Sequence, residues 1–385
     1  MTRGSAAARL SLFYAAVFAV VGVHLPFWPL WLKDRGLSAA EIGLVVACAY
    51  FARIAVLPLI GAVVDRRGDR RLPIVVLSGL AAVAWLLFEP AQGLPAIAVV
   101  TVLTAAAFAG ILPVGDSLAM MTVSAHRLDY GRVRLWGSLS FILAASLVGR
   151  LLMHEPPAIL LWLVSGLLAV TALVSLALPD RRVPAVERHA APAMPLLRQP
   201  AFLLFLAAAA LNQAAHTVYY SFATIHWKAA GLSDETIGLL WSEGVVAEIL
   251  LFLFSNRVVN RVGPAGLLLA AGLGGALRWL LLGATTELGW IVPAQLLHAA
   301  TFGCAHLAAM HFLQRAVPPG LAVRAQGLHA AVAVGLIPGL VTPLSGYLYD
   351  SVGGGAFLAM AALSGGCAVA AAALVRRWKG GVLEV

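Results

Sequence analysis

The sequence predicts an all-α membrane protein with twelve transmembrane helices, arranged as two six-helix parallel repeats. The first observation is composition: of the 385 residues, 61% are hydrophobic and 11% are charged, with a mean hydropathy of +0.92. Soluble domains are nearer half apolar and about a quarter charged. The second observation is length, because a span needs about 20 apolar residues and roughly 32 residues are available here for each helix with its connection. The third observation is a long internal repeat.

The repeat relates the two halves of the chain at an offset of 195 residues. Lys33 opens K-D-R-G-L-S-A-A-E-I-G-L, and Lys228 opens K-A-A-G-L-S-D-E-T-I-G-L. After an apolar run, the first copy ends G-A-V-V-D-R-R-G at Gly68, and the second ends N-R-V-V-N-R-V-G at Gly263. Thirteen of the thirty-six aligned positions are identical. The chain is therefore a duplicated module, and parallel repeats of this kind in transporters enclose a site near the middle of the membrane.

The basic residues indicate a membrane topology and exclude nucleic-acid binding, although the net charge is +9. A nucleic-acid protein would gather them on one water-facing surface. Here twenty of the 26 Lys and Arg residues fall in the two tails and in alternate loops. This is the positive-inside pattern of a multi-pass protein of the bacterial inner membrane with both termini in the cytoplasm. The cysteines lie singly in apolar runs, so we expect no metal site and no disulfide framework.

Six apolar runs in the first half predict an N-terminal six-helix bundle at 1–178. A basic turn at 65–71 separates the second helix from the third, and the loop 124–134 precedes the fifth. Pro26 and Pro29 are expected to break the first helix twice. The predicted helices are 10–31, 39–64, 72–88, 95–121, a fifth ending near 153, and 158–178.

The second half repeats this plan as a C-terminal six-helix bundle at 201–385. A cytoplasmic linker at 179–200, with five prolines and four arginines, joins the bundles. Frequent glycine and alanine, as in 266–275, allow close helix packing in lipid. The predicted helices are 201–225, 235–256, 264–284, 288–313, 321–349 and 354–375, followed by a basic tail.

The repeat places ionisable groups at equivalent depths but with different charge. Charged side chains inside the bilayer cost several kcal/mol, so each needs a reason. At the offset of 195, Arg53 corresponds to Glu248. In the same way Asp116 corresponds to His311, and Arg134 to His329. This asymmetry suits an anion and a proton bound across one central cavity, and the alternative is a set of ion pairs that only hold helices together.

Within this set, Glu248 is predicted to carry the proton, with a structural ion pair as the equal alternative. Asp116 is counted with the proton-coupling groups and is expected to pair with Arg134 or Arg132, as in a gate. Of the histidines in apolar runs, His298 is favoured as a proton-coupling group, because Arg278 is expected on the neighbouring helix and histidine titrates near neutral pH.

Aromatic and histidine side chains near the outer ends of the helices predict a surface for substrate. They could equally be core residues or part of the interfacial aromatic belt. The expected substrate-binding residues, beside Arg53 and Arg134, are His24, Trp28, His216, Tyr219, Tyr220 and Trp241. No phosphate-binding G-x-x-x-x-G-K-[ST], G-x-S-x-G or H-E-x-x-H motif occurs, so we expect neither an enzyme nor a cofactor other than a proton gradient.

Several motifs resemble the major facilitator superfamily. The segment Gly61-x-x-x-Asp65-Arg66-x-Gly68-x-Arg70-Arg71 matches its loop 2–3 signature, which implies a gate at these residues. The run 129–137 looks like the lactose permease branch, in which the arginine equivalent to Arg134 contacts sugar. Arg278 and His298 fall where that branch keeps an arginine and a histidine of its proton site. The glutamate expected one turn later is Thr301 here, which leaves Glu248 as the candidate.

The chain resembles bacterial 3-phenylpropionate permeases nearly end to end. The segments that carry this resemblance are 25–28, 129–138, 245–248, 283–286 and 298–310. It implies a monomeric, proton-coupled symporter of a small organic anion, such as 3-phenylpropionate. Arg53 or Arg134 would hold the carboxylate, and Trp28, Tyr219 and Tyr220 would pack its ring.

Three other functions remain open at this stage. The same scaffold could export drugs or metabolites by proton antiport, or could import a sugar or nucleoside. A membrane sensor that binds ligand without transporting it is the third alternative, and nothing in the sequence supports a soluble signalling domain.

Overall fold

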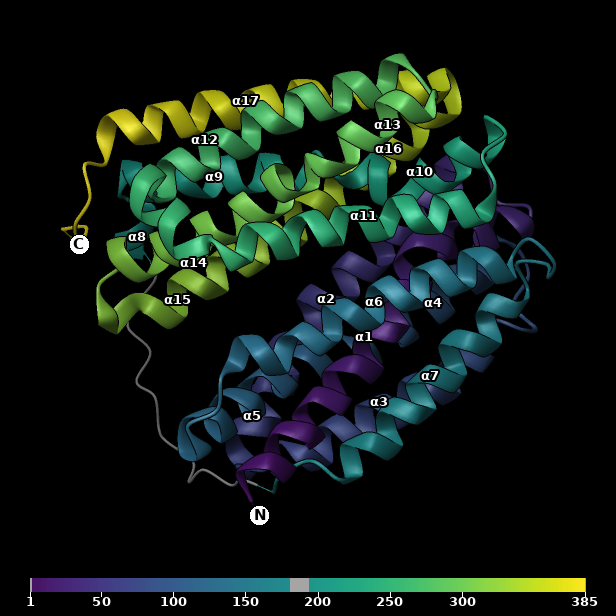
Figure 1. Cartoon of the computed structure of the whole chain (residues 1–385), viewed down its shortest axis with the longest axis horizontal. Coiled ribbons are helices and arrows are strands. Elements are labelled where there is room, and N and C mark those ends of the chain that lie inside the picture. The colour runs from purple at the N-terminus through teal and green to yellow at the C-terminus, as the bar shows by residue number, and fades with distance from the viewer. Residues whose placement is uncertain (1, 181–193, 385) are drawn as a thin grey trace. The chain divides into compact units, whose positions relative to one another are not determined.

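The computed structural model describes residues 2–180 and 194–384, and these residues are almost entirely helical and contain no strand (Figure 1). Nine helical stretches among them are long and apolar enough to cross a membrane. The predicted all-α membrane fold is therefore confirmed. Residues 181–193, which make up most of the predicted linker, lie outside the described residues.

The helices divide into two compact units. The first comprises Met1–Glu187 with Gly231–Ser242, and the second comprises Arg188–Ala230 with Glu243–Val385. The bundle boundaries expected from the sequence stay a prediction. The helices before the linker are α1 (Arg3–Asp34), α2 (Ala39–Arg67), α3 (Arg71–Leu86), α4 (Gly93–Ala109), α5 (Ile111–His126), α6 (Tyr130–Leu151) and α7 (Ile159–Leu176).

The helices after the linker are shorter and more often interrupted. Two of them are π-helices, labelled η1 and η3, and two are single 3₁₀ turns, η2 and η4. In order they are α8 (Met194–Leu197), α9 (Pro200–Ala214), α10 (Thr217–Ala229), α11 (Asp234–Leu253), α12 (Ser255–Ala284), α13 (Leu288–Leu296), η1 (Ala299–Cys304), α14 (Ala305–Ala316), η2 (Pro319–Leu321), α15 (Ala322–Leu328), η3 (His329–Leu336), α16 (Ile337–Val352), η4 (Gly353–Gly355) and α17 (Ala356–Arg377).

Both copies of the repeat place a glycine with a positive φ at each of the two turns. Gly36 and its counterpart Gly231 have φ of 84° and 91°. Gly68 and its counterpart Gly263 have φ of 69° and 71°, although their ψ angles differ, at −8° and 163°. Side chains other than glycine rarely adopt a positive φ, so each turn requires its glycine. The identities at these positions therefore preserve the positive φ, and at Gly68 and Gly263 they do not preserve the same turn.

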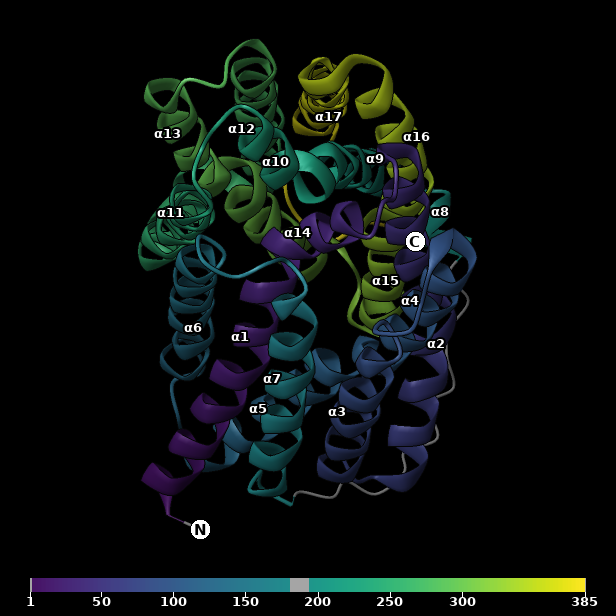
Figure 2. The same cartoon turned by 90° about the vertical axis from the view of Figure 1, so that its right-hand side faces the viewer.

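Helix pairing also repeats between the units. In the first unit α1 packs against α6 and α7, and α3 packs against α7 (Figure 2). In the second unit α9 and α10 pack against η3 and α16, and α12 packs against α17. Counted as spans, the first helix of each unit contacts the fifth, and the third contacts the sixth. The duplicated sequence thus builds the same neighbours twice.

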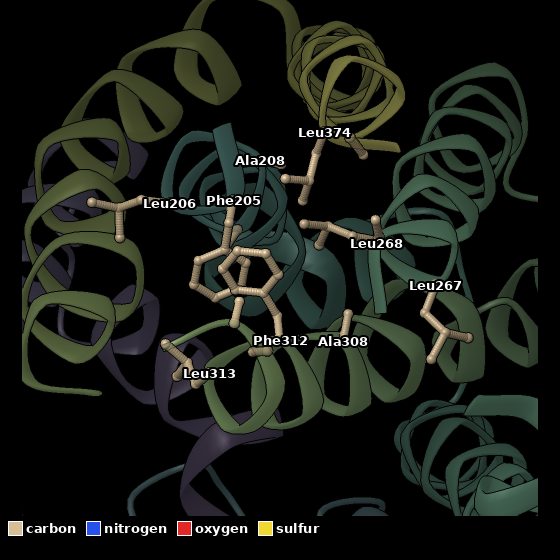
Figure 3. Close-up of a cluster of buried hydrophobic side chains, with 14 of the residues drawn as sticks. Phe205, Leu206, Ala208, Leu267, Leu268, Ala308, Phe312, Leu313 and Leu374 are labelled. Atoms are coloured by element: carbon tan, nitrogen blue, oxygen red, sulfur yellow. The ribbon is translucent and has the colours of Figure 1, made fainter. Parts of the chain in front are cut away.

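An aromatic and aliphatic cluster forms the core of the second unit (Figure 3). The rings of Phe205 on α9 and Phe312 on α14 stack with centroids 4.3 Å apart and planes 17° apart. Leu268 on α12 and Leu374 on α17 are buried in the same cluster. This core fixes α12, which carries Arg278.

The contact of α12 with α17 depends on Gly272. A Cβ at this position would lie 2.5 Å from the backbone nitrogen of Ala368. We therefore predict that Gly272→Ala separates the helices and costs about 1–3 kcal/mol, the range for overpacking. Thermal unfolding in detergent would show a lower Tm. Gly365→Ala on α17 is the matched control, since its Cβ would meet nothing within 4 Å, and an equal loss in both variants would contradict the prediction.

Two expectations about helix continuity are wrong. The helix α1 runs unbroken through Pro26 and Pro29, because neighbouring turns keep the helical path when a proline removes one hydrogen bond. Conversely, predicted single spans are divided: α4 from α5 at Gly110, and α9 from α10 at Ala215 and His216. The spans predicted at 288–313 and 321–349 each contain a π-helix.

Candidate transport site

Arg278 is the centre of a buried polar cluster in the second unit. It lies on α12 and is fully buried, with 0% of its surface exposed. One terminal nitrogen donates to His298 Nδ1 at 3.2 Å and to Thr301 Oγ1 at 3.0 Å. The other donates to Gln295 Oε1 at 2.8 Å. The guanidinium forms no ion pair with a carboxylate of the described residues, so its charge is held by neutral groups.

The bond from Arg278 fixes the tautomer of His298. A guanidinium can only donate, so Nδ1 of His298 must be the acceptor, and the hydrogen of the neutral ring lies on Nε2. That Nε2 is 3.7 Å from Glu248 Oε2 on α11. A second proton on His298 would have to displace Arg278 from Nδ1. Glu248 is therefore the group of this pair that can gain and lose a proton while the cluster stays intact.

Three glycines allow the helices to meet at this cluster. A Cβ at Gly244 of α11 would lie 3.3 Å from His298 Cβ. A Cβ at Gly274 of α12 would lie 2.8 Å from Ala300 Cβ, and one at Gly303 would lie 2.6 Å from Leu251 Cδ2. The π-helix η1 directly follows His298, and π turns are frequent at functional sites. Close packing leaves the Glu248 side chain 17% exposed and that of His298 11%.

Aromatic residues surround Arg278. Its guanidinium carbon lies 4.5 Å from the ring centroid of Tyr219 and 4.7 Å from that of Trp279. Such cation–π contacts lower the cost of a buried charge. The Tyr219 oxygen also accepts from Gln295 Nε2 at 2.8 Å. Tyr219, predicted to bind substrate, thus belongs to the surroundings of Arg278.

His216 and Tyr220 lie beside the aromatic residues that surround Arg278. The ring of His216 stacks on Tyr220 at 5.4 Å, and its edge meets Trp279 at 5.1 Å. His216 Nδ1 lies 2.8 Å from the carbonyl oxygen of Asn212. The amide of Asn212 in turn donates to the carbonyl of Thr301 at 2.9 Å. These residues link α9 and α10 to η1, and their roles toward substrate stay predictions.

The first unit holds its own carboxylate, Asp116 on α5. The expected ion pair of Asp116 with Arg134 or Arg132 is wrong. Instead Asp116 Oδ1 accepts from the hydroxyl of Tyr14 at 2.6 Å and lies 3.3 Å from that of Tyr130. Arg132 pairs with Asp129 at 3.5 Å, three residues earlier on the surface. Phenol hydroxyls from α1 and α6 therefore satisfy Asp116 where the sequence suggested an arginine.

Arg134 is held by aromatic faces. Its guanidinium carbon lies 3.8 Å from the centroid of Phe18 and 5.3 Å from that of Tyr14. A Cβ at Gly137, one turn later, would lie 2.9 Å from a terminal nitrogen of Arg134, so glycine there leaves room for this pose. No carboxylate of the described residues pairs with the guanidinium. The rings contact the flat face of the guanidinium and leave the N–H groups along its edge without a partner in the part of the chain that the structure describes. These N–H groups could donate hydrogen bonds to an anion.

The other candidate residues of the first unit lie in three different settings. Arg53 is exposed on α2 and has no hydrogen bond or ion pair to a described residue. Trp28 is buried in an aromatic cluster, stacked on Trp31 at 4.5 Å, and His24 stacks on it at 5.8 Å. Trp241 is buried on α11. The structure thus does not gather these residues around Arg134.

The predicted gate is an ordered turn between α2 and α3. Gly68 ends α2 in the left-handed conformation, and Arg70 reaches back to Asp65 at 4.0 Å. The Nε of Arg70 also donates to Ser117 Oγ on α5 at 2.8 Å. Gly61 and Arg66 are exposed. The basic turn therefore ties together three helices of the first unit.

Sequence reasoning did not identify several partners in these clusters. Thr301 and Gln295 lie three residues on either side of His298, and helical spacing could have placed them on its face. Tyr14 is 102 residues from Asp116, and no local pattern connects the two.

A helical bundle with such ionisable clusters inside its spans belongs to the class of secondary transporters. The chain belongs to the MFS_1 like family, whose sequence profile matches residues 7–359. The superfamily expected from the loop signature is therefore confirmed. The chain is 34% identical over 357 residues to a probable 3-phenylpropionic acid transporter of Escherichia coli K12, covering 91% of this chain and 93% of that protein.

Other similar proteins are transporters too. The chain is 30% identical over 354 residues to a maltose permease of Geobacillus stearothermophilus, with 88% and 86% of the two chains covered. The crystal structure of the nucleoside transporter NupG matches with a TM-score of 0.80 at 18% identity, covering 97% of this chain and 99% of NupG. An inward-facing bacterial homologue of the lysosomal transporter Spinster matches at 0.65 and 14% identity, covering 97% and 94%. The likeness to these two structures shows the fold alone.

The protein is thus a multi-pass inner-membrane transporter of a small molecule and not an enzyme. This agrees with the class of protein that the sequence predicted, a membrane transporter and not an enzyme.

Proposed function

We propose that the protein imports a small aromatic carboxylate together with a proton. The observation that carries this proposal is the cluster of Arg278, His298 and Glu248. This cluster is electrically neutral when Glu248 is ionised, because Arg278 carries one positive charge, Glu248 carries one negative charge and His298 is held neutral. Protonation of Glu248 leaves one net positive charge in a poorly hydrated interior, where charge is costly. A bound monoanion removes that cost.

Charge counting in each unit supports the same pairing. In the central parts of its spans the first unit carries Arg53, Arg134 and Asp116, two positive groups against one negative. The second unit carries Arg278, Glu243 and Glu248, one positive group against two negative. The first unit is suited to an anion and the second to a proton. The empty state and the state with both ligands are electrically balanced, whereas a single ligand leaves a net charge. This favours symport with one proton per monoanion.

Arg134 is the proposed anchor for the carboxylate. Its guanidinium is oriented by Phe18 and Tyr14 and has no carboxylate partner in the described residues, whereas Arg53 has no orienting contact. Planar guanidinium groups bind carboxylates through two parallel hydrogen bonds. The name of the Escherichia coli relative, which refers to 3-phenylpropionic acid, makes that compound the first substrate to test. We further propose that both termini lie in the cytoplasm, from the placement of the basic loops, and that the protein is a monomer, as the resemblance to its family implies.

Uptake of radiolabelled 3-phenylpropionate into proteoliposomes tests the proposal. We expect accumulation when an inward proton gradient is imposed, and its loss when an uncoupler is added. Accumulation driven by an outward gradient would identify an antiporter and contradict symport. Labelled maltose is the second substrate to test because of the 30% identity to a maltose permease. Gradient-driven uptake of maltose alone would overturn the carboxylate assignment.

A further inference from the structure

A line of stacked rings leads away from the Glu248–His298 pair along one face of η1 and α14. The rings of His298 and Phe302 have centroids 5.3 Å apart and planes within 8°. The rings of Phe302 and His306 follow at 6.3 Å and 7°. The spacing of four residues places all three on the same side of the helix. His306, the last ring of this stack, is exposed.

Glu248 lies on the same surface. Its Cγ would be 3.8 Å from a Cβ at Gly303, and Gly303 stands directly after Phe302 and three residues before His306. Because glycine has no side chain, nothing from position 303 separates the carboxyl group from the next turn of the helix. The first histidine on that next turn is His306.

A second histidine, His329 at the start of η3, continues the line. It lies near α14, the helix that carries His306, because its stacking partner Phe205 also stacks on Phe312 of α14 at 4.3 Å. The ring of His329 stacks on Phe205 at 5.6 Å, and Phe252 of α11 lies 6.0 Å from the ring of His306. These aromatic contacts hold both histidines in place.

Other ionisable groups flank this line. Glu248 and His298 stand before it, and His311 and Arg315 follow His306 along α14.

His298 cannot itself carry the proton of Glu248 away. Its Nδ1 accepts from Arg278 and its Nε2 faces Glu248, so both ring nitrogens are occupied inside the cluster. A proton on Glu248 needs a different acceptor if the cluster is to remain intact.

We propose that His306 and His329 form a proton-exit site, which takes the proton from Glu248 and releases it to water. The O–H bond of the Glu248 carboxyl breaks, and an N–H bond forms on His306, directly or through one water. The imidazolium of His306 then passes a proton to His329, which gives it to water as hydronium. Glu248 is left as a carboxylate and both histidines are left neutral. This inference rests on the proposed symport.

The test uses proteoliposomes that contain a pH-sensitive dye and are supplied with 3-phenylpropionate under an inward proton gradient. In His306→Gln and His329→Gln we expect net uptake and acidification of the lumen to slow together by about tenfold. This is below the 10²-fold or more that a positioned acid–base group typically contributes, since water can partly replace it. Exchange of labelled for unlabelled substrate at equal pH should keep its native rate, because exchange does not require Glu248 to lose its proton.

Two further variants separate a relay from a structural role. His154→Gln, at an exposed loop position, is the matched control and should behave as native. His306→Ala should lose net uptake and regain it when imidazole is added. Native acidification in both glutamine variants, or an equal loss of exchange, would overturn the exit site while symport stands. Absence of proton-coupled uptake in the native protein would overturn both proposals.

Discussion

Glu248→Gln is expected to abolish accumulation of substrate against its gradient while leaving exchange intact. The amide resembles the protonated carboxyl in shape and charge, and it fits the same place beside His298 Nε2. The site would therefore behave as though permanently protonated. Gradient-driven uptake measures the loss, and counterflow at equal pH on both sides measures what remains.

The same variant should change how binding depends on pH. In the native protein, raising the pH ionises Glu248 and adds a negative charge, so the affinity for an anion should fall as pH rises. In Glu248→Gln this charge is absent and the Kd should be flat with pH. Titration of labelled substrate against purified protein measures both curves.

Two controls define what the Glu248 result means. Glu155→Gln, in an exposed loop, should retain coupled uptake. If Glu243→Gln removed accumulation and Glu248→Gln retained it, the proton site would be one and a half turns earlier on α11, and the argument from His298 would be wrong.

Arg134→Ala is expected to weaken binding of the carboxylate by about 10- to 100-fold. A hydrogen bond to a charged group contributes about 1.5–3 kcal/mol, and about 1.4 kcal/mol corresponds to a factor of ten. Arg134→Lys should recover only part of this loss, because lysine keeps the charge but not the planar pair of donors or the stacking on Phe18. Equilibrium binding of labelled 3-phenylpropionate gives the Kd of each variant without contributions from later transport steps.

Arg132→Ala, two residues earlier on α6, is the matched control. Its exposed pair with Asp129 contributes about 0–1 kcal/mol at most, so substrate affinity should stay near native. Arg53→Ala decides between the two anchors that the sequence left open. Native affinity in Arg134→Ala together with a large loss in Arg53→Ala would move the carboxylate to α2.

Much of the polar site could be anticipated from the sequence, but only where the signal was local or duplicated. Arg278 and His298 were expected on neighbouring helices, and they lie in contact. Glu248 was predicted as the proton carrier because it is the counterpart of Arg53 in the repeat and because Thr301 stands where a carboxylate was expected. In the structure it lies beside His298. The predicted arginine partner of Asp116 was wrong. Tyrosine hydroxyl groups compete with arginine for a half-buried carboxylate, and the sequence does not show which of the two will be nearer.

The sequence by itself determined the membrane class, the repeat and the glycine turns. Each of these depends on hydrophobicity or backbone freedom within a short stretch, as at Gly36 and Gly231. Only the tertiary structure decided which polar groups meet. Glu248 and His298 lie fifty residues apart in the chain, and they come together because small residues let α11, α12 and η1 approach. Contacts across such separations depend on how whole helices pack, and no local pattern encodes that packing.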